Sequence, residues 1–239
     1  GVVDERAGRV LLAPNLRWLD SVNLIELVGE VIGRRTTLLQ EIRALAYGQL
    51  AVDPPDGERL SDFLLVDFGD GLGAAAAVGG KVYVGPLALN GELGHTPVVG
   101  NRRRCGCGSV GCVETLVNRA GLLESFAAEV GRKDVTFADL AEHIDRYGVR
   151  RWLADALEHV ATAIAAAANV MGIDRVIITG SLNELPASVM EHLSQAVING
   201  CLWRRFGKMI CHGAPRYRLA GLVAAGIDRI VMPLESWEV

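Results

Sequence analysis

The sequence has few aromatic residues and no apolar run long enough to cross a membrane. Phe, Trp and Tyr together make up 5% of its 239 residues, so Ala, Val, Leu and Gly supply the apolar bulk, which suits a soluble α/β protein. A membrane-spanning helix needs about 20 predominantly apolar residues, and no such stretch occurs. We therefore expect no membrane contact.

The chain also lacks an excess of positive charge. It has 24 Lys and Arg against 28 Asp and Glu, which gives a formal net charge of −4. Because duplex nucleic acids are usually bound by a basic face, we do not expect this chain to bind DNA by itself. The longest basic run, Arg102-Arg103-Arg104, is interpreted as a solvated loop.

Cysteine is scarce and unevenly distributed. Three of the five cysteines, Cys105, Cys107 and Cys112, lie within eight residues. Clustered cysteines in a chain of this length are more typical of metal ligands than of a disulfide framework, and they indicate a reducing, cytoplasmic compartment. Cys201 and Cys211 are interpreted as ordinary buried or partly buried thiols.

The clustered cysteines and a nearby histidine have the spacing His-x9-Cys-x-Cys-x4-Cys. Three thiolates and one imidazole are the ligand set of a closed structural zinc site, and the interleaved glycines allow a short loop to fold back tightly. The predicted zinc ligands are His95, Cys105, Cys107 and Cys112. The alternative is three free cysteines beside an unrelated histidine.

The segment 91–114, GELGHTPVVGNRRRCGCGSVGCVE, resembles the signature of the ROK family of repressors, open reading frames and kinases. The matching positions are Gly91, Glu92, Gly94, His95, Cys105, Cys107, Gly108, Gly111, Cys112 and Glu114. Members of the family are bacterial sugar kinases and sugar-responsive transcriptional repressors. The resemblance implies an α/β fold of the actin-like, ribonuclease H-like type, with two lobes, as in related ATPases.

The family resemblance also suggests how the chain is divided. Residues 1–56 would be the remainder of the small N-terminal lobe and residues 57–239 the large lobe, with the C-terminal helix packing back toward the small lobe. Gly1-Val2-Val3-Asp4 is typical of the end of a strand rather than the start of a protein. We therefore expect further residues before Gly1 and an incomplete small lobe.

Hydrophobic periodicity and turn residues predict the order of the elements. Strands are expected at 1–4, 10–15, 36–40, 63–68, 74–78, 81–84, 174–179 and 208–211. Helices are expected at 21–32, 41–50, 114–130, 136–147, 149–171, 185–198 and 219–230. Asp20 or Ser21 is the expected N-cap of the first helix, and Thr136 with Asp139 is a loose capping pair.

The resemblance implies a sugar pocket whose chemistry suits the residues present. Carboxylates accept hydrogen bonds from sugar hydroxyls, and a zinc-bound histidine keeps its other ring nitrogen available. The implied sugar-binding residues are Asn15, Gln40, Glu41, Glu92, His95 and Glu114. Family kinases have Asn-Asp where this chain has Gln40-Glu41, and that aspartate is the general base. Glu41 would be the catalytic base of a kinase, or else an acid favoured by the dipole of a helix first turn.

The glycine-rich turn after the strand at 63–68 departs from the kinase pattern. In sugar kinases of the family this turn reads LGTGIGGG and receives ATP phosphate. The corresponding residues are Gly69, Asp70, Gly71 and Gly73, with Asp70 at the threonine position. A carboxylate repels phosphate unless magnesium intervenes, which favours weakened nucleotide binding. Gly180 retains one of the two glycines that contact adenosine in the family.

Two functions follow from the resemblance. The first is the sugar-sensing effector domain of a transcriptional regulator, with structural zinc shaping the pocket and DNA bound only through an upstream helix-turn-helix. The second is an ATP-dependent hexose kinase that uses Mg-ATP and Glu41. A scaffold that binds zinc but neither sugar nor ATP is a third reading, which the retained Glu92 and Glu114 disfavour. The family also implies a homodimer or a dimer of dimers.

Overall fold

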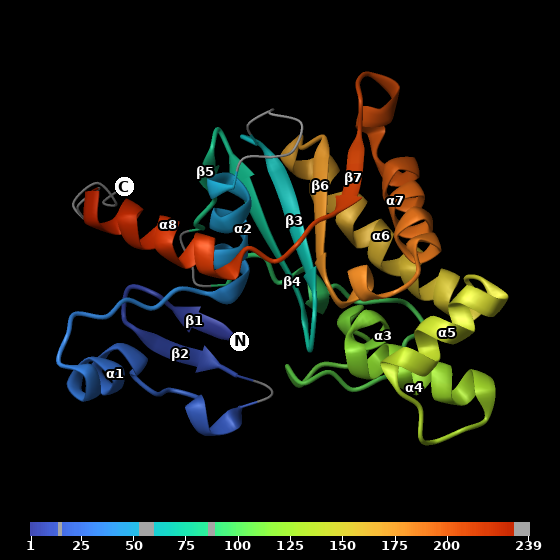
Figure 1. The fold of residues 1–239 in the computed structure, drawn as a ribbon, viewed down its shortest axis with the longest axis horizontal. Coiled ribbons are helices and arrows are strands. Elements are labelled where there is room, and N and C mark those ends of the chain that lie inside the picture. Colours follow the sequence, from blue (N-terminus) through green and yellow to red (C-terminus); the bar gives the residue numbers. More distant parts are fainter. Residues whose placement is uncertain (14–15, 53–59, 86–88, 232–239) are drawn as a thin grey trace. The chain divides into compact units, whose positions relative to one another are not determined.

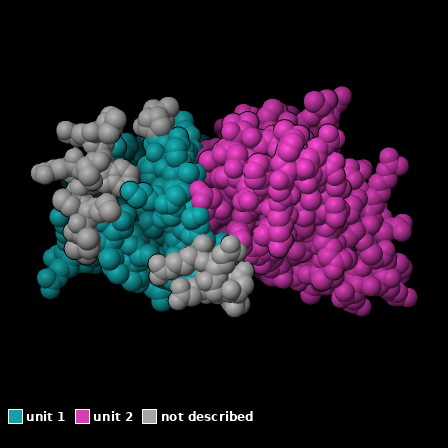
Figure 2. Space-filling model, turned by 90° about the horizontal axis from the view of Figure 1, so that it is seen from above, with its two compact units in different colours: residues 1–61, 77–90, 216–239 teal, residues 62–76, 91–215 magenta. Residues whose placement is uncertain are grey.

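The computed structural model describes residues 1–13, 16–52, 60–85 and 89–231. The chain divides into two compact units that alternate along the sequence, coloured separately in Figure 2. Unit 1 comprises Gly1–Ser61, Ala77–Asn90 and Arg216–Val239, and unit 2 comprises Asp62–Ala76 and Gly91–Pro215. The lobe boundaries expected from the sequence, 1–56 and 57–239, stay a prediction.

A five-stranded sheet has the order β5-β4-β3-β6-β7 (Figure 1). Its strands are β3 (Phe63–Phe68), β4 (Leu72–Val78), β5 (Lys81–Val82), β6 (Arg175–Gly180) and β7 (Ile210–Gly213). β3 pairs in parallel with β6, and β6 in parallel with β7. The sequence of β3, FLLVDF, is almost continuously apolar because strands of a parallel sheet are covered on both faces. Five of its six residues are buried.

Helices pack around the parallel strands to form the hydrophobic core of unit 2. They are α3 (Glu114–Val117), α4 (Arg119–Val130), α5 (Phe137–Tyr147), α6 (Arg151–Met171) and α7 (Ala187–Gly200). Leu153, Leu157, Val160 and Ile164 of α6 are fully buried, and their spacing of three or four residues is that of one helix face. The short helices η2 (Leu93–His95), η3 (Ser181–Glu184) and η4 (Leu202–Arg205) complete the unit.

Unit 1 is built from smaller elements. β1 (Val2–Asp4) and β2 (Arg9–Leu12) form an antiparallel pair, followed by η1 (Arg17–Leu19), α1 (Leu24–Ile32) and α2 (Glu41–Ala51), and the unit ends with α8 (Arg218–Val231). A partly buried ion-pair cluster links the β1–β2 turn to α2 and α8: Glu5 of the turn accepts from Arg43 of α2 at 3.1 Å and from Arg229 of α8 at 2.6 Å. Glu5 also accepts the backbone N–H of Gln40 at 2.8 Å.

The structure corrects four of the predicted elements. Residues 36–40 form no strand, because side chains bind their backbone polar groups. Leu38 O accepts from Arg229, and Gln40 N–H donates to Glu5. The helix expected at 114–130 is divided at Asn118, whose extended backbone and side chain cap α4. Asn23, not Asp20 or Ser21, caps α1. The strand expected at 81–84 ends at Val82.

No helix in the described ranges is both long and apolar enough to cross a membrane.

Candidate functional site

The four predicted zinc ligands converge in unit 2. The side-chain ligand atoms of His95, Cys105, Cys107 and Cys112 all lie within 4.8 Å of one another. A tetrahedral zinc ion bonds sulfur at about 2.3 Å and nitrogen at about 2.0–2.1 Å, which separates two sulfurs by about 3.8 Å and a sulfur from a nitrogen by about 3.6 Å. The Cys107 and Cys112 sulfurs are 3.8 Å apart, and Cys105 Sγ is 3.6 Å from His95 Nδ1. These two separations match a tetrahedral zinc site, and the four side chains together could hold a metal ion.

Backbone hydrogen bonds hold the cysteine loop in this shape. Cys105 N–H donates to Ser109 O at 2.8 Å, and Gly108 N–H donates to Cys105 O at 3.0 Å. Gly111 has a φ of 91°, and a Cβ there would lie 2.9 Å from Asn101 O. Only glycine meets both the left-handed backbone and the close approach. All three thiols are free in the structure.

The three thiols have different proton affinities without a metal. Burial raises the pKa of Cys105 to about 12 and also raises that of Cys112. A hydrogen bond from the Ser109 backbone lowers the pKa of Cys107 to about 7. Because zinc binds thiolates, protons must leave the cluster when a metal enters.

Arg103 fixes the cysteine loop to the neighbouring helices. Its guanidinium donates to Thr115 O at 2.7 Å, to Gly121 O at 3.1 Å and to Ser125 Oγ at 2.9 Å. The interpretation of residues 102–104 as a solvated basic loop is therefore wrong for Arg103, although Arg102 and Arg104 are exposed. The inward side chain was not predictable from the run of three arginines, because its acceptors are two backbone carbonyls and a serine hydroxyl on neighbouring helices.

Three of the predicted sugar-binding residues lie at the cluster: His95 is one of its members, and Glu92 and Glu114 lie beside it. His95 directs Nδ1 toward Cys105, while its Nε2 lies 3.5 Å from Glu92 Oε2. Glu114 places Oε1 at 3.6 Å from Cys105 Sγ, and its Oε2 accepts the Leu72 N–H at 2.9 Å. Glu92, His95 and Glu114 are partly exposed, so the two carboxylates form one polar group with the histidine of the cluster.

The other predicted sugar-binding residues belong to unit 1. Gln40 is buried and precedes α2, whereas Glu41 is exposed in its first turn. Arg218 donates from Nε to Glu41 Oε1 at 2.9 Å, a partner that sequence reasoning missed because it lies 177 positions away. Asn15 lies outside the described residues.

The glycine turn between β3 and β4 forms backbone hydrogen bonds within unit 2. The N–H groups of Gly69 and Ala74 donate to the carbonyls of Gly71 and Gly91. Asp70 is exposed. At the carboxyl end of the neighbouring strand β6, Gly180 has a φ of 97°, and Asp67 of β3 accepts from Thr179 of β6 at 2.7 Å.

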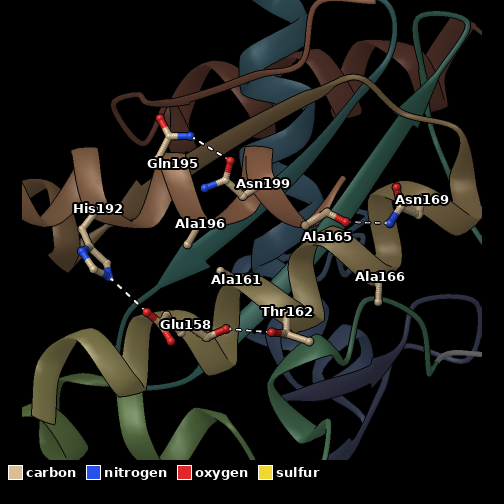
Figure 3. A pocket seen from close by; sticks show the side chains of 11 residues that line it. Glu158, Ala161, Thr162, Ala165, Ala166, Asn169, His192, Gln195, Ala196 and Asn199 are labelled. Atoms are coloured by element: carbon tan, nitrogen blue, oxygen red, sulfur yellow. Dashed lines mark hydrogen bonds and ion pairs between the residues drawn. The ribbon is translucent and has the colours of Figure 1, made fainter. Parts of the chain in front are cut away.

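A groove of about 560 Å³ lies elsewhere in unit 2, between α6 and α7 (Figure 3). Alanines of both helices form part of its lining, with polar groups such as His192, Gln195 and Asn199 among them. Gln195 Nε2 donates to Asn199 Oδ1 at 3.0 Å, and His192 Nε2 lies 4.0 Å from Glu158 Oε1. None of the predicted site residues lines this groove.

Known proteins with related sequence or structure fall into two functional groups. The xylose repressor of Caldicellulosiruptor bescii is 32% identical over 123 residues, which cover 52% of this chain and 30% of the repressor. A ROK hexokinase from Thermus thermophilus has a TM-score of 0.77 at 23% identity, over 94% of this chain and 74% of the hexokinase. A ROK family transcriptional regulator, a homologue of the E. coli MLC protein, has a TM-score of 0.78 at 19% identity, over 95% of this chain and 61% of the regulator.

These similarities confirm the predicted actin-like α/β fold, which the hexokinase and the regulator share. The matched segment amounts to less than a third of the xylose repressor. The model of the ROK family matches residues 1–214, most of the chain. The chain therefore belongs to the ROK family.

Proposed function

We propose that this chain is the sugar-binding effector domain of a ROK-family transcriptional regulator, with a structural zinc ion in the Cys3His cluster. The observation that carries the proposal is the position of Glu92 and Glu114 beside that cluster, next to its own His95. Carboxylates accept from sugar hydroxyls, and the second ring nitrogen of a metal-bound histidine stays available to a ligand. The identity shared with a xylose repressor supports the choice of regulator.

Zinc would be held by His95, Cys105, Cys107 and Cys112, and it supplies rigidity rather than catalysis, since a closed four-ligand site leaves no open position. With Nδ1 on the metal side, His95 Nε2 and the Glu92 carboxylate face each other. A sugar hydroxyl there could both donate to the carboxylate and exchange a hydrogen bond with the ring. The polar groups of a sugar would then be satisfied on binding, as specific recognition requires.

The contacts of the residues that correspond to the catalytic and phosphate-binding groups of family kinases favour a sugar sensor over a kinase. Arg218 binds one oxygen, Oε1, of the Glu41 carboxylate, the group that a kinase would use as its general base. The Leu72 N–H, in the turn that receives phosphate in family kinases, already donates to the Glu114 carboxylate. Asp70 adds a further negative charge at this turn.

An ATP-dependent hexose kinase is the second candidate. A carboxylate is retained and exposed at the first turn of α2, in Glu41, and the fold matches that of a ROK hexokinase. Mg-ATP would then be the cosubstrate. In either case we propose a cytoplasmic protein, which suits its free thiols, and a homodimer or dimer of dimers. If the protein is a regulator, operator DNA would be bound only through a helix-turn-helix outside this chain.

The proposal is tested by melting the zinc-loaded chain with xylose, other pentoses, hexoses and amino sugars. A bound sugar at about 100 times its Kd stabilises the folded state by about 2.7 kcal/mol, which raises the melting temperature. The shift should disappear in Glu92→Gln and persist in Glu142→Gln, an exposed glutamate of α5 used as the matched control. A panel in which no sugar shifts the melting temperature would contradict the proposal.

A further inference from the structure

The glycine turn at residues 69–72 is held by hydrogen bonds from one short segment, residues 114–119. Arg119 N–H donates to Gly69 O at 3.1 Å, and Asn118 Nδ2 donates to Asp70 O at 3.1 Å. In the opposite sense, the Leu72 N–H donates to Glu114 Oε2 at 2.9 Å. The turn therefore depends on α3 and its junction with α4 for three of its polar contacts.

At its N-terminal end, the same segment follows directly on the loop that carries the predicted metal ligands Cys105, Cys107 and Cys112, called the metal loop below. Cys112, a predicted metal ligand, comes two residues before Glu114, and its carbonyl accepts from the Thr115 hydroxyl at 2.8 Å and from the Thr115 N–H at 3.1 Å. Glu114 Oε1 lies 3.6 Å from the sulfur of a second ligand, Cys105. In the structure one carboxylate thus accepts from the Cys105 thiol with one oxygen and from the turn with the other. When a metal binds the Cys105 thiolate, the connection that remains runs through Cys112 and Thr115.

The approach of the turn to this carboxylate is close. A Cβ at Gly71 would lie 3.0 Å from Glu114 Oε2, which is tighter than ordinary van der Waals contact. The Glu114 carboxylate therefore fits against the backbone of the turn, and glycine at position 71 provides the space. A hydrogen bond to an ionised acceptor is about twice as strong as one between neutral groups, so Glu114 is the strongest of the three connections.

We propose that Glu114 is a positioning residue that couples the Cys3His metal loop to the glycine turn. When the metal loop is assembled, the carboxylate holds the Leu72 amide and orders the turn. When the loop loses its metal, α3 loses the anchor at Cys112 and the turn opens. This coupling goes beyond the proposed function, because it requires neither a sugar nor DNA.

The test is hydrogen–deuterium exchange at the Leu72 amide, resolved to single residues, in the zinc-loaded chain. Glu114→Ala removes the acceptor and should accelerate exchange at Leu72 by about tenfold or more. Glu114→Gln keeps an oxygen acceptor and should restore part of the protection, whereas Glu114→Asp is one methylene shorter and should resemble Glu114→Ala. Glu142→Gln is the matched control and should exchange as the wild type does.

Further measurements distinguish coupling between the metal loop and the turn from general destabilisation of the fold. The amides of Ile177 and Ile178 in the core strand β6 should stay protected in every variant, and metal content should stay at one ion per chain. Removing the metal with a chelator should accelerate exchange at Leu72 in the wild type but add little in Glu114→Ala. Equal exchange at Leu72 in the zinc-loaded wild type and Glu114→Ala, with the β6 amides protected in both, would overturn the proposal.

Discussion

The contact between α2 and α8 in unit 1 leaves no room for a side chain at position 221. A Cβ added to Gly221 would lie 1.7 Å from Ala44 O and 2.8 Å from Gly48 N, so the two helix backbones touch. Gly221→Ala must force α8 away from α2 by more than an ångström. Overpacking of a well-packed contact costs about 1–3 kcal/mol, and the same helix pair carries Glu41 and Arg218.

Gly226 of α8 is the matched control, because a Cβ there meets nothing within 4 Å. Gly226→Ala should be neutral or stabilising by about 0.5–1 kcal/mol, since alanine favours the helix interior over glycine. The assay is urea denaturation, together with amide exchange in α2. If Gly221→Ala and Gly226→Ala had the same effect on the free energy of unfolding, the proposed close packing of α8 on α2 would be refuted.

Three further predictions address the metal site, the buried charges and the pH dependence of stability. Cys112→Ser should reduce bound zinc to well below one ion per chain, measured by elemental analysis, whereas Cys201→Ser should leave it at one; equal metal content would contradict the ligand assignment. Glu5→Gln should lower the free energy of unfolding by about 3–5 kcal/mol, because it leaves the buried Arg43 without its counter-charge; a loss below about 1 kcal/mol in urea denaturation would contradict this. Hydrogen bonds from the N-cap threonine hold the pKa of Asp139 below its usual value, so its stabilising effect is complete above about pH 4 and disappears as the pH falls through the lowered pKa. Asp139→Asn should therefore show a weaker loss of stability in acid than the wild type, and identical acid profiles would count against the capping interaction.

Local signals in the sequence were sufficient to predict that the Cys3His cluster assembles. The spacing of His95 and the three cysteines identified four residues that the fold brings within 4.8 Å of one another. The capping pair of Thr136 and Asp139 was also predictable, because it depends on residues within one turn. These features require no knowledge of distant contacts.

The features that were missed depend on partners far away in the sequence. Arg218 is 177 positions from Glu41, and no local pattern indicates their hydrogen bonds. Arg103 turns inward because carbonyls of α3 and α4 accept from it. Residues 36–40 have strand-like composition but form no strand, since strand formation needs a neighbouring backbone edge and Glu5 and Arg229 occupy their polar groups instead. Tertiary contacts override local propensity at each of these positions.

The most direct test of the sensor interpretation is ADP release by the full-length protein with Mg-ATP and the same sugar panel. We expect no turnover with any sugar, while one sugar still raises the melting temperature, because Arg218 and Glu114 occupy the groups that a kinase would use. Turnover at ordinary kinase rates, about 1–100 per second, would make Glu41 a working base. That result would contradict the assignment as a sensor and establish the hexose kinase instead.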